Sequence, residues 1–275
     1  MFSGFMSCNL TKRFRPAKGV LIMLAVILML FALTSSALAE GKTPGQNEWQ
    51  FFTQFNLWTP DITTETTTGT DIKISIDDII DNLDFVYMGT FGASKGKWTF
   101  LTDVIYLDLE HSHNYTLVDS PLASLDLTNL NMTAWIVTPM VVYNVLETDR
   151  VTLGFLAGAR YLHLKLESDT TLRMPLTTTE SSGSSSGDAW NRIVGVRGKF
   201  HLPGKWSVPY LFDVGTGDTD LTWQAYAAIA YRSDRVGWSL GYRHLEWQFD
   251  EGDAGGKLID KLHTSGPMVG IKYWF

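Results

Sequence analysis

Cysteine is nearly absent from this sequence, since Cys8 is the only one in 275 residues. It precedes the apolar stretch of residues 19–33, whereas the lipid-modified cysteine of a lipoprotein would follow such a stretch. The chain beyond residue 39 therefore has no disulfide, no thiol nucleophile and no thiolate metal ligand. A domain in this part must be held together by hydrogen bonds and burial.

Only one long apolar run is present, GVLIMLAVILMLFAL at residues 19–33. Basic residues precede it and the small-residue pattern Ala37-Leu38-Ala39 follows it, which is the arrangement of a secretory signal cleaved between Ala39 and Glu40. The run is shorter than the roughly twenty residues of a spanning helix. We predict a signal peptide at residues 1–39 and one exported domain at 40–275; an uncleaved inner-membrane anchor is the alternative. The basic residues are Lys12, Arg13, Arg15 and Lys18.

Positive charge is scarce. Without residues 1–39 the chain carries 18 Lys and Arg against 29 Asp and Glu, a net charge of −11. No basic patch with interleaved aromatics is present, so nucleic acid is not an expected partner. The segment GTGD at residues 215–218 lacks the strand-to-helix context and the lysine of a phosphate loop, and we expect no cofactor.

The rest of the chain alternates strand and turn patterns. Aromatic residues make up 13%, with ten Trp and ten Tyr, which favours a transmembrane barrel with interfacial aromatic belts over a soluble all-β protein. Strands are predicted at ten ranges, with eight or twelve also compatible with the pattern. These ranges are 48–58, 83–93, 97–109, 130–146, 150–166, 189–202, 206–216, 219–232, 236–249 and 264–275.

The connections sort by length. Four of them, at residues 94–96, 147–149, 203–205 and 233–235, are tight turns with Gly, Pro, Asp or Ser. Those of the other edge are mostly long, at 59–82, 110–129, 167–188 and 250–263, and only Gly217-Asp218 is short. Short periplasmic turns and longer extracellular loops are typical of outer-membrane barrels. We predict a short helix at 76–83 and a mobile, Ser-rich end to loop 167–188.

Each strand presents one apolar face. In 206–214, for example, Trp206, Phe212 and Val214 share a face, and Asp213 lies on the other. Period-two alternation of this kind predicts a lipid-facing wall and a lumen. The apolar residues change phase near Leu162 and after Arg243, which predicts bulges or strand segments rising above the membrane.

The predicted lumen face carries charges that lipid would reject. A barrel of about ten strands is narrow, so side chains should fill it. We predict interior pairing of Arg with Asp, with Asp103 and Asp213 as the acidic partners, and no wide pore. The predicted lumen charge network is Asp103, Arg160, Arg197, Lys199, Asp213, Arg232, Arg243 and Lys272.

The last strand, TSGPMVGIKYWF, ends on aromatics, with Tyr273 and Phe275 on one face. It resembles the C-terminal strand of bacterial outer-membrane β-barrels, which the barrel-insertion machinery reads. The resemblance is to poorly characterised bacterial outer-membrane β-barrel proteins. It extends to three further segments, WNRIVGVRGKF, VPYLFDVGTGDTDLTWQAYAAIAYR and GYRHLEW. The resemblance implies architecture, a location in the outer membrane, and lipids and lipopolysaccharide as partners. It implies no assigned activity.

Catalytic and metal motifs are weak. His111 and His113 alternate near Glu110 without a third ligand at a fixed spacing, and the aspartates of residues 77–81 and 213–220 have no EF-hand spacing. The pairs His163 with Glu167 and His244 with Glu246 define no nucleophile, base and orienting group. We expect no catalytic, cofactor or metal site.

The sequence thus predicts an all-β, antiparallel, up-and-down transmembrane barrel with a structural, envelope or surface-interaction role through its loops. The alternatives are a rim enzyme acting on lipid or peptide, a narrow solute channel, and a soluble periplasmic barrel with the Trp206 face turned inward.

Overall fold

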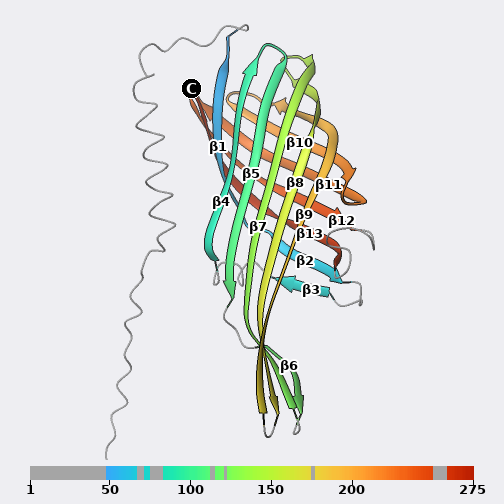
Figure 1. Cartoon of the computed structure of the whole chain (residues 1–275). Helices are drawn as coiled ribbons and strands as arrows, with labels where there is room; N and C mark the ends of the chain where they lie inside the picture. Colours follow the sequence, from blue (N-terminus) through green and yellow to red (C-terminus); the bar gives the residue numbers. More distant parts are fainter. Residues whose placement is uncertain are drawn as a thin grey trace, which may run out of the picture. The chain divides into compact units, whose positions relative to one another are not determined.

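In the computed structural model, a closed antiparallel sheet of ten strands forms the domain (Figure 1). The structure describes residues 48–66, 71–74, 83–111, 115–120, 123–174, 177–249 and 259–275. In these ranges no helix is long and apolar enough to cross a membrane. The ten strands are β1 (Gln50–Trp58), β4 (Leu83–Lys95), β5 (Trp98–His111), β7 (Ala123–Glu147), β8 (Val151–Met174), β9 (Thr177–His201), β10 (Trp206–Gly217), β11 (Leu221–Ser233), β12 (Val236–Gln248) and β13 (Ile259–Trp274).

The first and last strands close the wall. Phe55 of β1 pairs with Gly89 of β4 on one side and with Ile271 of β13 on the other. Closure leaves each strand of the barrel paired on both sides, which is what a sheet needs in lipid. The predicted up-and-down barrel and its ten strands are confirmed.

Short turns gather at one end of the barrel, the turn end. They connect β4 to β5, β7 to β8, β9 to β10 and β11 to β12. Three of them contain a residue with positive φ, namely Gly96 (φ 55°), Gly204 (φ 75°) and Asp234 (φ 29°), and glycine adopts this region without strain. The register Phe52 with Trp274 brings the start of β1 and the end of β13 to the same end.

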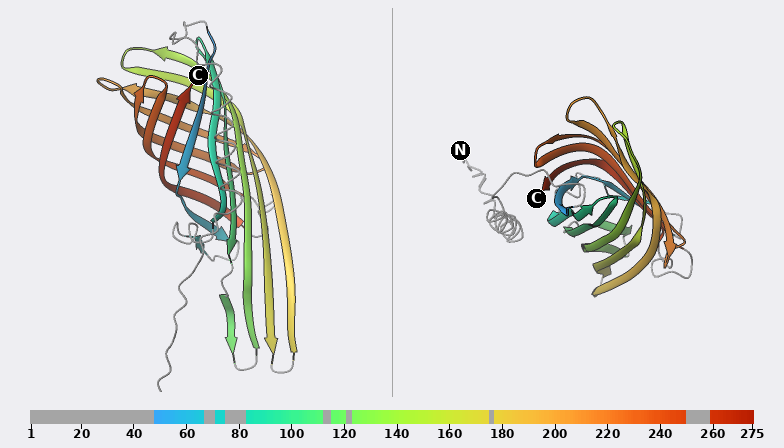
Figure 2. Two further views of the ribbon diagram at one scale, coloured as in Figure 1. Left: turned by 90° about the vertical axis from the view of Figure 1, so that its left-hand side faces the viewer. Right: turned by 90° about the horizontal axis from the view of Figure 1, so that it is seen from above.

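At the other end the sheet continues well past the barrel (Figure 2). Here β6 (Tyr115–Ser120) pairs with β7, and β7, β8 and β9 remain hydrogen-bonded, with Glu167 opposite Ser184 and Met174 opposite Thr177. We call β6 with residues 123–131, 166–174 and 177–187 the extension. The expectation of a loop at 167–188 is therefore wrong, whereas the mobility expected of its Ser-rich end stays a prediction. Its composition gives little to bury, but backbone pairing with a long neighbouring strand and the β-propensity of threonine continue the ladder.

Two further strands occupy the first predicted loop. β2 (Asp61–Thr66) follows β1 after Pro60 and pairs with β13, with Ile62 opposite Thr264. β3 (Asp71–Ile74) pairs with β2. The predicted helix at 76–83 falls outside the described residues except for Leu83, which begins β4.

The outer face is apolar. Leu240, Val194 and Phe155 are 63%, 60% and 59% exposed, whereas Asp213 on the inner face is fully buried. Exposed apolar side chains in this number need lipid around them. The alternative in which the Trp206 face points inward is wrong, because Trp206 is 49% exposed.

Aromatic pairs border this apolar band. Near the turn end Trp98 lies 4.7 Å from Tyr143 and Trp206 lies 5.0 Å from Tyr231, between ring centroids. Toward the extension the corresponding pairs are Tyr106 with Trp135 (4.4 Å) and Tyr161 with Trp190 (4.7 Å). Two such belts, one at each edge of the band, are the girdles of a transmembrane barrel.

The predicted bulges near Leu162 and after Arg243 are absent. The β8–β9 and β11–β12 registers run without a shift, and Leu162, Leu245 and Trp247 lie on the same inner face as the charged residues. The alternation pattern shifts at these positions because this part of the lumen is itself lined by apolar side chains. Leu245 and Trp247 are fully buried.

Candidate functional site

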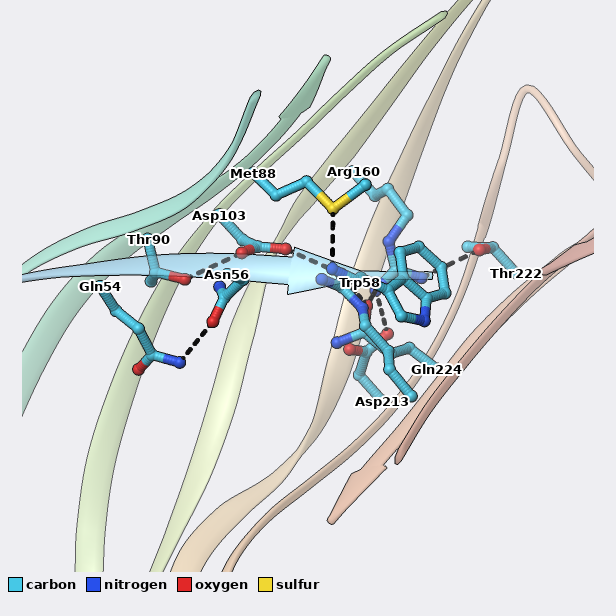
Figure 3. A network of polar contacts seen from close by, with 11 residues as sticks. Gln54, Asn56, Trp58, Met88, Thr90, Asp103, Arg160, Asp213, Thr222 and Gln224 are labelled. Atoms are coloured by element: carbon cyan, nitrogen blue, oxygen red, sulfur yellow. Dashed lines mark hydrogen bonds and ion pairs between the residues drawn. The ribbon is translucent and has the colours of Figure 1, made fainter. Parts of the chain in front are cut away.

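The lumen holds a polar cluster that joins strands from all sides of the barrel. Arg160 of β8 donates from Nη2 to Asp213 Oδ1 of β10 at 2.6 Å, and Arg243 of β12 donates from Nη2 to Asp103 Oδ2 of β5 at 2.7 Å. All four are at most 8% exposed as whole residues. The two ion pairs form the centre of the candidate site (Figure 3).

Uncharged side chains connect the two ion pairs. Gln224 Oε1 accepts from Arg243 Nη2 at 2.7 Å and from Arg160 Nη2 at 3.4 Å. Thr222 Oγ1 accepts from Arg160 Nη1 at 2.9 Å, and Thr90 Oγ1 donates to Asp103 Oδ1 at 2.9 Å. Charge-assisted hydrogen bonds in a site shielded from water are strong and fix the position of each side chain. The cluster therefore cross-braces the wall.

An apolar layer lies beside the cluster on the side of the extension. Arg243 contacts it directly, with its guanidinium carbon 5.1 Å from the centroid of the Trp58 ring. Its buried members are Trp58, Met88, Ile105, Ile136, Leu162, Ala189, Leu245, Trp247 and Met268. These side chains come from strands around the whole lumen and pack against one another, so they form a cross-section of core inside the barrel.

The remaining predicted lumen charges lie on the turn-end side of the cluster. Arg197, Lys199, Arg232 and Lys272 line one cavity there, which Asp103 and Arg243 also line, but they form no ion pair with Asp103 or Asp213. Sequence reasoning missed Gln224, Thr222 and Thr90. Their positions on the inner face were the available signal, but uncharged residues gave no reason to select them.

The two histidines that the sequence suggested as catalytic candidates, His163 and His244, lie in separate groups on the outer face. His163 Nδ1 lies 2.8 Å from Asp188 Oδ1, and Tyr161 donates to the same oxygen. These hydrogen bonds, from Tyr161 first and then His163, hold the pKa of Asp188 below its ordinary value. Glu167, the partner suggested by sequence, instead pairs with Lys165 at 2.6 Å.

The second histidine group lies on β12 and β13. His244 Nε2 is 3.3 Å from Glu246 Oε2, and Glu246 Oε1 also accepts from Gln248 at 2.8 Å and pairs with Lys261 at 3.5 Å. Strands β9, β10 and β11 separate this group from His163 on β8. The two groups therefore do not combine into one site.

Other predicted residues fall at the chain ends and in loops. Ala39 and Glu40, the loop aspartates at 77–81, His113 and the side chain of His111 lie outside the described residues. In the described ranges no three His, Cys, Asp or Glu side chains gather as metal ligands would. Tyr273 and Phe275 lie on the outer face, with ring centroids 5.0 Å apart.

No family model matches the chain, and no curated protein matches its sequence. Among solved structures, the outer membrane protease OmpT from Escherichia coli superimposes with a TM-score of 0.51 at 9% identity, over 85% of this chain and 99% of that one. The chain has the fold of an outer-membrane β-barrel. Two further structures are similar at lower TM-scores. The translocator domain of autotransporter NalP from Neisseria meningitidis has a TM-score of 0.40 at 14% identity, over 94% of this chain and 98% of that one. Ail of Yersinia pestis has a TM-score of 0.34 at 10% identity, over 83% of this chain and 99% of that one.

In this outer-membrane barrel the apolar band faces lipid. The turn end corresponds to the periplasmic side and the extension to the extracellular side, because outer-membrane barrels have their short turns in the periplasm. The cluster thus lies inside the wall, within the membrane, and the cavity lies below it toward the periplasm.

Proposed function

We propose that this protein is a sealed outer-membrane scaffold that holds a binding surface, the extension, outside the cell. The observation that carries the proposal is the length of three neighbouring strands. β8 runs from Tyr161 in the outer aromatic belt to Met174, thirteen residues further, and stays paired with β9 throughout. At about 3.3 Å per residue the sheet extends roughly 40 Å along the strand past that belt.

One edge of the extension is open among the residues that the structure describes. There β9 pairs with β10 from Asn191 to His201, while its residues 177–187 pair with β8 alone. An edge strand presents backbone N–H and C=O groups to which another strand can add. This edge supports a role in surface interaction.

The filled lumen supports sealing over transport. The ion-paired cluster and the apolar layer follow each other along the lumen, and Arg160, Leu245 and Trp247 are fully buried in them. A narrow channel would require these side chains to move. Packing of this density stabilises a wall and gives no wide path to solutes.

A role without catalysis is part of the proposal. A rim enzyme would need a histidine, a carboxylate and a nucleophile in one place. Three strands separate the His163 and His244 groups, and each histidine is engaged with its own carboxylate. This separation supports a binding role.

Lipids and lipopolysaccharide are the proposed partners of the outer face. Arg192 is exposed on β9, two residues from Trp190 on the side of the apolar band. Its long side chain can extend from there to the outer belt, where a cation suits a lipopolysaccharide phosphate. Tyr273 and Phe275 would be read by the barrel-insertion machinery during assembly.

The test shortens the extension. A variant in which residues 168–183 are replaced by a two-residue turn keeps the barrel, as unboiled electrophoresis would verify. In a strain that lacks the protein, we expect the full chain to restore wild-type surface adhesion and detergent resistance and the shortened variant to restore neither. A control variant with Ser and Thr exchanged within 177–186 keeps the length and should restore both. Full restoration by the shortened variant, or no defect in the deletion strain, would overturn the proposal.

A further inference from the structure

A cationic cavity lies inside the periplasmic half of the barrel, apart from the extension. Its volume is about 510 Å³, within the range of small-molecule sites, and Gly96 and Gly237 beside two of the short turns place it at the turn end. We call it the vestibule. Its charged walls come from β9, β11 and β13, with Arg197, Lys199, Arg232 and Lys272.

These four cations are close enough to repel one another. Lys272 lies within electrostatic range of Arg197, Lys199 and Arg232, and Lys199 within that of Arg232, Arg197 and the carboxylate of Glu147. Repulsion of this kind disfavours an empty site and favours one that holds negative charge.

Carboxylates do not balance this charge. The two lumen aspartates are used by Arg160 and Arg243. In the parts of the barrel that the structure describes, no carboxylate lies within 4.0 Å of Arg197, Lys199 or Lys272. Glu147 also lines the vestibule, and its Oε1 accepts from Asn144 at 2.7 Å. With Arg243 and Asp103 included, the lining of the vestibule has five Lys and Arg side chains against two carboxylates, a formal excess of three positive charges, although the chain as a whole is acidic.

Aromatic rings hold two of the cations in place. Lys272 Nζ lies 3.6 Å from the centroid of Phe52, and the Arg232 guanidinium carbon lies 4.1 Å from that of Trp274. A ring face attracts a cation without taking up its hydrogen-bond donors. The Lys272 ammonium and the guanidinium edge of Arg232 therefore remain able to bind an anion.

We propose that the vestibule binds a small, soluble, polyvalent oxyanion of the phosphate-ester class from the periplasm. Arginine forks match phosphate oxygens in pairs, and lysine adds point charges. Amide and hydroxyl groups on the other walls, from Gln54 and Asn56 of β1, Asn144 of β7 and Ser239 of β12, suit the polar remainder of such a solute. Lipid phosphates lie outside the wall, whereas these cations face inward, so the ligand enters from the periplasmic water.

Isothermal titration calorimetry with inorganic pyrophosphate tests this on the mature chain refolded in an uncharged detergent. We expect saturable binding of one pyrophosphate per barrel, weakened at least tenfold when salt rises from 50 to 300 mM, in line with screening. The double variant Arg197→Gln with Lys272→Gln should bind pyrophosphate at least ten times more weakly. The single variant Arg232→Gln, at the mouth of the vestibule, should weaken binding by at least the same factor. Lys272→Arg, which keeps the charge, should still bind pyrophosphate.

Lys205→Gln with Arg235→Gln is the matched control, because both cations lie at the same end but outside the vestibule. It should leave pyrophosphate binding unchanged, and every variant is checked for folding by its unboiled electrophoretic mobility. The proposal would be overturned if the folded wild-type barrel showed no saturable binding of pyrophosphate. It would also be overturned if binding weakened equally in the control and in the vestibule variants, which would indicate an adventitious ion only.

Discussion

Arg243 and Asp103 form an ion pair with an Nη2–Oδ2 distance of 2.7 Å, although 140 residues separate them in the chain. Their strands, β12 and β5, are four steps apart around the wall by way of β13, β1 and β4. The pair therefore crosses the lumen and links strands that share no ladder. Such a link resists distortion of the barrel in a way that neighbouring-strand hydrogen bonds do not.

Removing one partner of this pair should be costly. Asp103→Asn leaves Arg243, which is 5% exposed, without its counter-charge, and we expect a loss of about 3–5 kcal/mol in the free energy of unfolding. Urea titration of the barrel in lipid vesicles, followed by tryptophan fluorescence, measures it. The apolar double variant Asp103→Leu with Arg243→Met should recover much of the loss. A single-variant loss below about 1 kcal/mol would contradict a structural role for the pair.

Gln224 should couple the two ion pairs. Because its Oε1 accepts from both Arg160 and Arg243, the effects of Asp103→Asn and Asp213→Asn on unfolding should differ from additivity by about 0.5–3 kcal/mol. The same double-mutant cycle in a Gln224→Leu background should come closer to additivity. Additive effects in the wild-type background would show that the pairs act independently.

Lipid exposure of the outer face predicts a position-dependent cost for charge. Val194 is 60% exposed and lies on β9 between Trp190 and Phe200, which are 52% and 48% exposed. Val194→Arg should lower the free energy of unfolding in vesicles by about 2–4 kcal/mol. Ser184→Arg, on the same strand and face but in the extension, is the matched control and should change it by less than about 0.5 kcal/mol. Equal effects at both positions would contradict the assignment of the band.

The strand pattern could be predicted from sequence because alternation has a period of two residues and the short turns carry their own signals. It was sufficient for the ten strands and for the outward face of Trp206, Phe212 and Val214. The paired strands of residues 167–187 could not be predicted, since their stability depends on a long neighbour and not on side chains that need burial.

Only part of the lumen's arrangement could be predicted from the sequence. Charged residues on the inner face identified Asp103 and Asp213 as candidates, but the partner of each depends on how the wall tilts and closes, which brings β8 to β10 and β12 to β5. The predicted bulge before Leu245 and Trp247 was wrong because a polar lumen was expected there. A narrow barrel instead fills part of its interior with apolar side chains. The four unbalanced cations were visible in the sequence, but their separation from the aspartates was not.

The most direct test of the sealed scaffold is the conductance of the purified mature barrel in a planar lipid bilayer, recorded beside Trp247→Ala and the double variant Arg160→Ala with Arg243→Ala. Trp247 and Arg160 are fully buried in the two layers that close the lumen. The account predicts no steady open channel for the wild-type chain, and frequent openings when both layers are weakened in one triple variant. A stable, wide conductance of the wild-type barrel, unchanged by these substitutions, would contradict it.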